Sequence, residues 1–471
     1  ANKGEIKRVE DDINKILSFK KYYKEFALNE RMIFYFAYYN LIAYIPQYNN
    51  HYYENIIKVY KEAREFYHSS IVLEMRDQEI ARREYNLLNK IFLHSFMYYL
   101  DDGLGSQMEF IDIIDEIKDT FDDEMDRDLG HAVLTYLHDE MDDLELVFYL
   151  KNYFTFYFND AKELTFNEPK DEIYVRCENV VDTANMIFDF MAHSYICVAK
   201  KEEICNYILS CSLQLFTQVP RSKYVATYVE EATSSIVKKA LPFIRNVDFK
   251  EEVFTKLILV RQTENYMHSK MVEKISLSIL DHMNQNRYPL IRSMLEEGFW
   301  DYSDLRGFVA RSARIHDVGK SLVLGIVNQQ IRNLDNTEFD QIKLHPVNTD
   351  VFQRDFHFSF YKDIIRGHHK SYDGKSGYPL DFDNTKSKYK LIIDLITIAD
   401  CIDAGTDIYG RNYHEGKNFD MVFKELQNGA NTLYNPDIVT YIGIDNNLMN
   451  ELKYIVGEYR MELRYKGYKK E

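Results

Sequence analysis

Proline and glycine are scarce in this chain. Only 8 of its 471 residues are Pro and 18 are Gly, and no low-complexity tract occurs. This composition argues against extended disorder and for an ordered fold. Trp occurs once, whereas Tyr occurs 38 times and Phe 30 times. We interpret the aromatic excess as core and groove filling, with no cofactor implied.

Cysteine is also scarce, and its spacing argues against thiolate metal sites. None of the five cysteines forms a Cys-x-x-Cys pair, the usual element of a structural zinc site. An odd number of cysteines, together with the lack of an apolar signal core in the first residues, predicts a cytoplasmic protein with reduced thiols. The five are Cys177, Cys197, Cys205, Cys211 and Cys401.

Basic residues are in deficit, since 58 Lys and Arg against 75 Asp and Glu give a net charge of -17. This balance argues against a broad basic surface for DNA or acidic lipid. The longest apolar run, residues 32–45, ends at Pro46 and is too short to cross a bilayer, so no membrane segment is expected. An acidic chain that acts on an anionic substrate would need bound cations or a local cluster of Arg and Lys.

Helical periodicity dominates residues 1–247, which we predict to form a separate all-α region. Dense apolar segments at 32–45, 91–100 and 144–158 are each followed by a polar break and a more amphipathic segment. This alternation predicts stacked helical hairpins, either an α-solenoid loosely similar to tetratricopeptide arrays or an irregular bundle. We expect the region to bind a partner protein or to mediate self-association, with a regulatory role.

The C-terminal region, residues 248–471, contains five short motifs with His or carboxylate side chains. Glu264 and His268 are four residues apart, so on a helix they share a face. His316 is adjacent to Asp317, and an imidazole beside a carboxylate suits a bridge between two ions. The candidate metal ligands, in chain order, are Glu264, His268, His316, Asp317, His345, His368, His369 and Asp400.

This set offers nitrogen and oxygen ligands without sulfur. Such ligands favour iron or manganese, with magnesium or zinc as alternatives. Seven or eight ligands exceed the capacity of one ion, so we expect two ions, with a third held through Glu264. Each motif alone is weak evidence, because single histidines in helices are usually packing residues. The five motifs together indicate a metal centre.

In order and spacing these motifs resemble the HD-GYP family of metal-dependent phosphodiesterases, over about residues 255–430. The resemblance implies a helical domain that hydrolyses cyclic di-GMP to pGpG or GMP. It places the family's metal ligands on the seven candidates from His268 to Asp400, and a third-metal glutamate on Glu264. It also implies catalytic roles for His316, Asp317 and Lys320, and substrate contacts for Lys320, Tyr378, Arg411 and Tyr413, with Tyr378 in the signature Gly377-Tyr378-Pro379.

The chain departs from the family pattern in the loops. Lys370 stands where a glutamate usually follows the paired histidines, and Thr349 where a glycine usually follows the His-Pro. One residue is inserted between Gly374 and Gly377. None of these changes removes a ligand, but they leave the substrate open. The alternatives are an HD hydrolase for another cyclic dinucleotide or a nucleotide phosphoester, and a non-catalytic nucleotide-binding sensor or scaffold.

Overall fold

The protein is helical throughout the part of the chain that the structure describes. This computed structural model describes residues 3–48, 53–69, 72, 78–100, 105–164, 168–219, 223–323, 334–347, 358–408 and 416–469. Every regular element in these ranges is a helix, which confirms the all-α prediction. Only two isolated β-bridges occur there, Lys370–Gly377 and Ala430–Tyr434. Within the same ranges, no helix combines the length and the apolar character needed to cross a membrane.

The chain forms two compact units. The first comprises residues 1–160 and 176–204, and the second comprises residues 161–175 and 205–471. Helices α10 (Lys170–His193) and α11 (Val198–Gln218) therefore contribute to both units. Residue 248, where we place the start of the second domain from the sequence, lies inside the second unit. The domain assignment stays a prediction.

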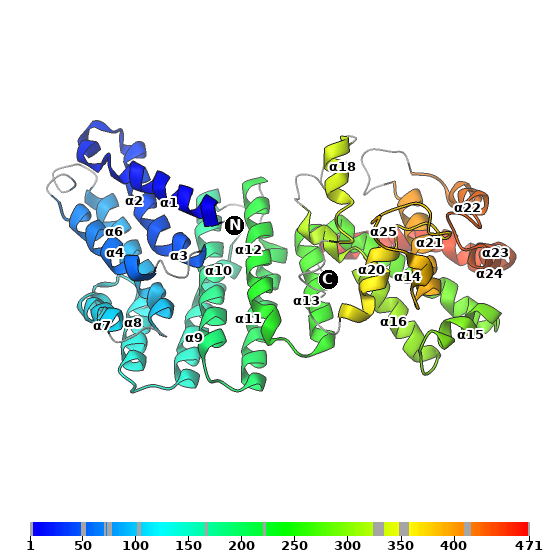
Figure 1. Cartoon of the computed structure of the whole chain (residues 1–471), viewed down its shortest axis with the longest axis horizontal. Coiled ribbons are helices and arrows are strands. Elements are labelled where there is room, and N and C mark those ends of the chain that lie inside the picture. Colours follow the sequence, from blue (N-terminus) through cyan, green and yellow to red (C-terminus); the bar gives the residue numbers. More distant parts are fainter. Residues whose placement is uncertain are drawn as a thin grey trace. The chain divides into compact units, whose positions relative to one another are not determined.

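The first unit is built from paired helices with an aromatic core. Consecutive helices pack on each other, α1 on α2, α4 on α6 and α7 on α8, as expected of helical hairpins (Figure 1). Tyr60 stacks on Phe92 with ring centroids 4.0 Å apart, and Tyr99 on Phe110 at 4.6 Å. The helices are α1 (Lys3–Leu17), η1 (Lys20–Glu25), α2 (Leu28–Tyr39), η2 (Asn40–Tyr44), α3 (Ile45–Tyr48), α4 (Tyr53–Tyr67), α6 (Gln78–His94), η3 (Ser95–Tyr99), α7 (Gly105–Ile117), η4 (Lys118–Thr120), α8 (Glu124–Leu137) and most of α9 (Asp143–Lys162).

The second unit contains the predicted metal ligands. Between residues 223 and 322 its helices are α12 (Lys223–Ala240), η5 (Leu241–Phe243), α13 (Val247–Arg261), α14 (Thr263–Gln285), α15 (Pro289–Glu296), α16 (Tyr302–Ile315) and η6 (Val318–Leu322). The remaining helices are α18 (Asn336–Ile342), η7 (Phe358–Tyr361), α20 (Lys362–Gly367), η8 (Asn384–Lys386), α21 (Lys390–Thr406), α22 (Phe419–Asn428), α23 (Pro436–Ile444), α24 (Asn446–Tyr454), η9 (Ile455–Tyr459) and α25 (Arg460–Lys469).

Helix α14 is the centre of this second unit. It packs against both α16 and α21 and also contacts α13, α24 and α25 (Figure 1). Its buried face repeats every four residues at Met271, Ile275, Ile279 and Met283, the spacing that keeps side chains on one side of a helix. Helix α21 is buried on nearly all sides between residues 392 and 403, which explains its almost continuous apolar sequence. These three helices hold the site in place.

Candidate metal centre

Three packed helices bring the ligands from distant parts of the sequence together. His268 lies on α14, Asp400 lies on α21, and His316 follows directly after the last residue of α16. Because α14 packs against both of the other helices, these side chains converge on one region. Burial is nearly complete, since His316 is 0% exposed and Asp317 is 1% exposed. A charged or polar side chain in such a place must find a partner or bind an ion.

Three of the histidines are oriented by the ends of their helices. The Nδ1 atom of His316 lies 2.7 Å from the Ala313 carbonyl oxygen, and that of His345 lies 2.7 Å from the Ile342 oxygen. His368 Nδ1 makes the same contact with the Ile365 carbonyl at 2.8 Å. Carbonyls at a helix C-terminus lack intrahelical partners and can only accept, so each Nδ1 must donate a proton. In the neutral rings Nε2 is therefore the free metal-binding nitrogen.

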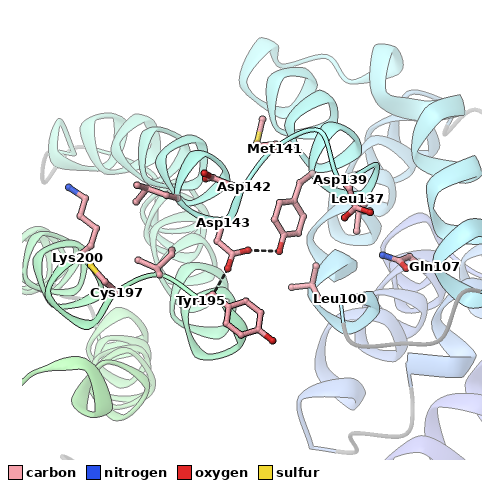
Figure 2. Close-up of a pocket in the computed structure, with 13 residues that line it drawn as sticks. Leu100, Gln107, Leu137, Asp139, Met141, Asp142, Asp143, Tyr195, Cys197 and Lys200 are labelled. Atoms are coloured by element: carbon pink, nitrogen blue, oxygen red, sulfur yellow. Dashed lines mark hydrogen bonds between the residues drawn. The ribbon is translucent and has the colours of Figure 1, made fainter.

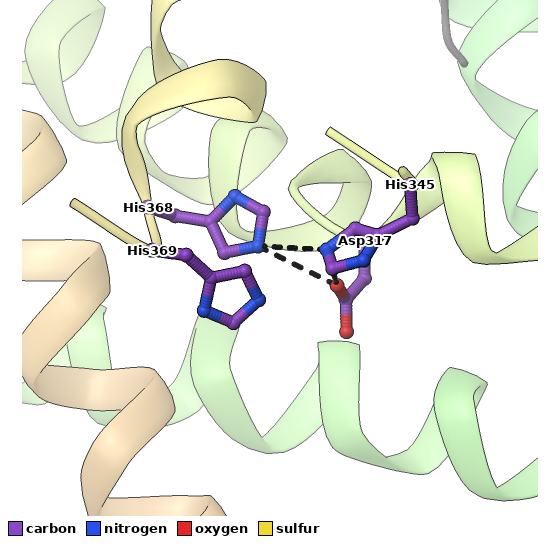
Figure 3. Close-up of side chains that lie close together, drawn as sticks. All are labelled: Asp317, His345, His368 and His369. Carbon is purple, nitrogen blue, oxygen red and sulfur yellow. Dashed lines mark hydrogen bonds and ion pairs between the residues drawn. The ribbon is translucent and has the colours of Figure 1, made fainter. Parts of the chain in front are cut away.

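The seven predicted ligands from His268 to Asp400 form two buried clusters. One contains Asp317, His345, His368 and His369 (Figure 3), and the other contains His268, His316 and Asp400. In each cluster the ligand atoms lie within 4.8 Å of one another. Both clusters could hold a metal ion, and they offer only nitrogen and oxygen atoms, as the sequence predicts.

The carboxylate of Asp317 connects the two clusters. Its Oδ1 lies 3.1 Å from His345 Nε2 and 3.6 Å from His368 Nε2. Its Oδ2 lies 3.4 Å from His268 Nε2 and 3.5 Å from His316 Nε2. One oxygen therefore faces each cluster. A carboxylate placed in this way would be available to an ion in either cluster.

The distances within the site fit bound cations. His345 Nε2 and His368 Nε2 lie 3.2 Å apart although both carry lone pairs, which repel unless a cation or proton lies between them. Nitrogen ligands about 2.1 Å from a shared ion lie about 3.0–3.4 Å from each other. The Nε2 atoms of His316 and His369 are buried and have no hydrogen-bond partner among the described residues. The side chains present therefore suit metal ions.

The surroundings of these side chains shift their pKa values toward the protonation states that bind metal ions. Burial lowers the pKa of His316 to about 3, and burial with the charges of neighbouring imidazoles holds the pKa of His369 well below its usual value, so both rings are neutral at pH 7. Burial opposes ionisation of Asp317, but the charge of Lys320 and the neighbouring imidazoles together outweigh it and keep the pKa of Asp317 well below the usual range. Lys320 Nζ donates to Asp317 Oδ2 over 2.5 Å.

His268 differs from the other ligands. Burial would lower its pKa, but the carboxylates of Asp400 and Asp403 outweigh burial and raise the pKa to about 9. Its Nε2 lies 3.1 Å from Asp400 Oδ1, and its Nδ1 lies 2.6 Å from Asp403 Oδ2. Without a bound cation the ring carries an extra proton, which an ion at Nε2 would replace.

Tyr378 of the signature loop lies over the first cluster. Its ring centroid is 4.5 Å from that of His369 and 6.1 Å from that of His345. The backbone turns at Gly377 with φ of +86°, a conformation that L side chains rarely adopt. Lys375, the residue that lengthens this loop, is 84% exposed at its side chain and lies 3.7 Å from Asp373.

The three predicted site residues that remain are Glu264, Arg411 and Tyr413. The carboxylate of Glu264 forms a forked ion pair with the guanidinium of Arg464, and neither described cluster includes it. Arg411 and Tyr413 lie outside the described residues.

Asp403 and Arg460 belong to the site but were not predicted to do so. Asp403 contacts the ring of His268, and Arg460 holds Asp403 from the far side. The Asp400-x-x-Asp403 spacing is a signal that could have indicated Asp403, because residues three apart share a helix face. No local pattern marks Arg460.

Comparison with known proteins gives no functional assignment, because no family model, curated protein or solved structure matches this chain. Its function must be inferred from its motifs and from the geometry of the site.

A separate cavity of about 640 Å³ lies in the first unit (Figure 2). Asp143, at the start of α9, lines this cavity. Asp143 accepts a hydrogen bond from the Tyr136 hydroxyl at 2.7 Å and another from the Tyr195 backbone N–H at 2.5 Å. This carboxylate joins α8 to the segment between α10 and α11, which is a structural role.

Proposed function

We propose that the chain is a metal-dependent phosphodiesterase of the HD-GYP type that hydrolyses cyclic di-GMP to pGpG or GMP. The observation that carries the proposal is the position of Asp317, with one carboxylate oxygen facing each of two imidazole clusters. Paired ions held in this way are typical of enzymes that cleave phosphodiesters. The order of the motifs along the chain supports this reaction class.

Each of the two clusters would hold one ion. His345, His368 and His369 would hold one ion, His268, His316 and Asp400 would hold the other, and Asp317 would be shared. The nitrogen and oxygen ligands favour iron or manganese. When bound, such ions supply Lewis-acid chemistry, since they polarise a phosphoryl oxygen and lower the pKa of water.

The chain's own residues orient the substrate and compensate charge. The ammonium of Lys320 contacts Asp317. It is therefore positioned to neutralise the charge that develops on a phosphate bound beside Asp317. The ring of Tyr378, over His369, offers a surface for a base or ribose. Arg411 and Tyr413 are proposed to contact the phosphate because they match the family's motif. Burial of His316 and Asp317 excludes bulk water from the reacting atoms.

A second candidate substrate is another cyclic dinucleotide or a nucleotide phosphoester. Lys370 favours this alternative, because it replaces a glutamate of the family and is only 5% exposed, directly beside the paired histidines. A buried lysine in place of a glutamate would change which group of a base or phosphate the site accepts.

We infer that the first unit serves regulation through a protein partner or a second copy of the chain. The support is an exposed apolar stripe on α9, where Leu144 is 48% and Phe148 is 60% exposed, with Phe156 further along the same helix. Exposed apolar stripes of this kind commonly take part in association.

The proposal is tested by incubating manganese-loaded protein with cyclic di-GMP and a panel of related cyclic dinucleotides, and separating the products. We expect pGpG or GMP from cyclic di-GMP. Lys320→Met should lower turnover by about 10²–10³-fold, as does loss of one donor to a developing charge. Protein that holds its ions and hydrolyses no member of the panel would show that the site is not a phosphodiesterase of this class.

A further inference from the structure

Helix α25, at the C-terminal end of the described chain, begins with a buried arginine, Arg460, which lies behind the proposed metal centre. Arg460 is 3% exposed and begins α25, directly after the π-helical turn η9. Inserted π-turns shift the side chains that follow them and recur at functional sites. Arg460 contacts the C-terminal end of α21, the helix that carries Asp400.

In the described part of the chain, the side-chain hydrogen bonds of Arg460 all go to the end of α21. Its Nη2 donates to Asp403 Oδ1 at 2.6 Å and to Thr406 Oγ1 at 2.9 Å. Its Nη1 donates to the Thr406 carbonyl at 2.6 Å, and Nη2 also reaches the Asp403 carbonyl at 3.2 Å. The guanidinium thus satisfies carbonyls at the end of the helix and holds the Asp403 carboxylate at the same time.

The two oxygens of the Asp403 carboxylate contact two different residues, Arg460 and His268. Its Oδ1 accepts from Arg460, and its Oδ2 lies 2.6 Å from His268 Nδ1. With Nδ1 held in this way, His268 Nε2 points at Asp400 Oδ1, 3.1 Å away, and at Asp317 Oδ2, 3.4 Å away. Arg460, Asp403 and His268 therefore form a continuous row that ends at the ligand atoms.

We propose that Arg460 is a positioning residue for metal ligation, which acts by fixing the Asp403 carboxylate that directs His268 Nε2 into the metal centre. The inference rests on the proposed metal centre, but it concerns residues that the motifs do not include. A carboxylate behind a ligating histidine fixes both the ring orientation and the nitrogen that carries the proton. Arg460 in turn fixes which oxygen of Asp403 faces the ring.

Arg460 determines which atom of residue 403 faces it and which faces His268. A guanidinium can only donate hydrogen bonds, so the atom of residue 403 that faces it must be an acceptor. In Asp403→Asn the new amide must turn its oxygen toward Arg460 and its NH₂ toward His268 Nδ1. The NH₂ then donates to Nδ1, and the ring proton is transferred to Nε2, where the ion should bind.

The first measurement is the affinity for Mn²⁺, followed through the EPR signal of the free ion at one fixed pH. Asp403→Asn should bind Mn²⁺ roughly 10–100-fold more weakly than the wild-type chain, as is usual when an outer partner of a ligand is lost. The control is Asp394→Asn, which removes a buried carboxylate on the same helix. Among the described residues, Asp394 accepts hydrogen bonds from Lys390 and Asn435 and from none of the proposed ligands. Its Mn²⁺ affinity should stay within about twofold of wild type, as expected for independent sites.

The second measurement separates positioning from support of the fold. Removing the donor in the double variant Asp403→Asn, Arg460→Met lets the new amide turn its oxygen back toward His268. We therefore expect this double variant to bind Mn²⁺ more tightly than Asp403→Asn alone. If Arg460 only caps α21, the second change should instead weaken binding further, and that result overturns the proposal.

Circular dichroism and thermal unfolding establish that each variant is folded. Where the double variant does not fold, Asp403→Asn decides alone, since Mn²⁺ affinity equal to wild type, or a loss equal to that of Asp394→Asn, overturns the proposal. If the wild-type chain itself binds no Mn²⁺, the proposed metal centre and this inference both fail. If the wild-type chain binds two ions and Asp403→Asn binds them equally well, only this inference fails.

Discussion

Gly377 approaches the backbone of His369 so closely that a Cβ atom on Gly377 would lie 2.0 Å from the His369 carbonyl oxygen. The residue after this glycine, Tyr378, lies over the His369 ring. The loop that contains Gly377 and the backbone of His369, a proposed metal ligand, are therefore in direct contact. A side chain at Gly377 would force the loop away from the site.

The first prediction is that Gly377→Ala damages the site. The positive φ and the contact with the His369 carbonyl should together cost about 1–3 kcal/mol and displace Tyr378. We expect a lower unfolding temperature and at least a tenfold fall in turnover of cyclic di-GMP. Gly307→Ala is the matched control, because a Cβ atom there meets nothing within 4 Å on helix α16. Gly307→Ala should be neutral or slightly stabilising, and equal effects of the two changes would contradict the prediction.

The second prediction concerns the number of ions. Elemental analysis of protein loaded anaerobically with manganese or iron should find at least two ions per chain, because the ligand atoms form two clusters. Asp317→Asn should retain about one ion or fewer and lose hydrolysis, since a carboxamide offers one oxygen where the carboxylate offers two. Its helical circular dichroism should persist.

Asp340→Asn provides the control for this second prediction. Asp340 pairs with Lys343 three residues later, as Asp317 pairs with Lys320, but its side chain is 65% exposed. Its loss should change neither the ion count nor turnover. Folded wild-type protein that never holds more than one ion would refute the two-ion assignment.

The motifs identify the ligands better than they identify what holds the ligands. His268, His316 and Asp400 could be predicted because each belongs to a short motif whose chemistry is local. Arg460 could not, because its contact with Asp403 joins α25 to α21 across 57 positions of the chain, and helical periodicity gives only the face on which a residue lies. The direction of a side chain depends on its partners in space.

Glu264 is a second residue whose contacts could not be predicted from the sequence. Its spacing from His268 predicts a shared helix face, and both residues do lie on α14. The direction of its carboxylate, however, depends on Arg464, a residue about two hundred positions later in the chain, which binds it with both terminal nitrogens. Sequence spacing therefore predicted where Glu264 lies but not what it contacts.

The third prediction follows from this ion pair. If Glu264 is a ligand for a third ion, Arg464 competes with that ion for the carboxylate, so Arg464→Met should strengthen binding of a third Mn²⁺. Arg464 Nη2 also lies 3.5 Å from Asp407 Oδ1, so the variant loses this contact as well and some stability with it. Adding Glu264→Gln to Arg464→Met should abolish the gain. Unchanged affinity for the third ion in Arg464→Met would show that Glu264 serves the ion pair alone.

The fourth prediction concerns the pH dependence of stability, away from the metal centre. Glu297 is largely buried, which raises its pKa to about 8, and the nearby charge of Asp394 acts in the same direction. Its Oε1 accepts the Leu391 backbone N–H at 3.1 Å, while Oε2 has no hydrogen-bond partner among the described residues. The folded protein therefore favours the protonated acid.

The sign of the effect follows from where the proton is held. Between the ordinary pKa of 4.5 and the folded value of about 8, Glu297 is protonated when folded and ionised when unfolded. Unfolding then releases a proton, so the free energy of unfolding falls as the pH rises through this window. Above it the loss is complete, and with allowance for partial exposure it should be on the order of 2–3 kcal/mol.

Glu297→Gln should remove this dependence, because glutamine keeps the acceptor for Leu391 and stays neutral at every pH. We expect unfolding temperatures of the variant and the wild-type chain to be similar near pH 4.5–5 and to diverge as the pH rises, with the variant more stable by several degrees at pH 8.5. Glu296→Gln, at an exposed neighbour that pairs with Arg292, is the control and should leave the wild-type pH profile unchanged. Parallel curves for Glu297→Gln and the wild-type chain across the window would mean that Glu297 is already ionised in the folded protein.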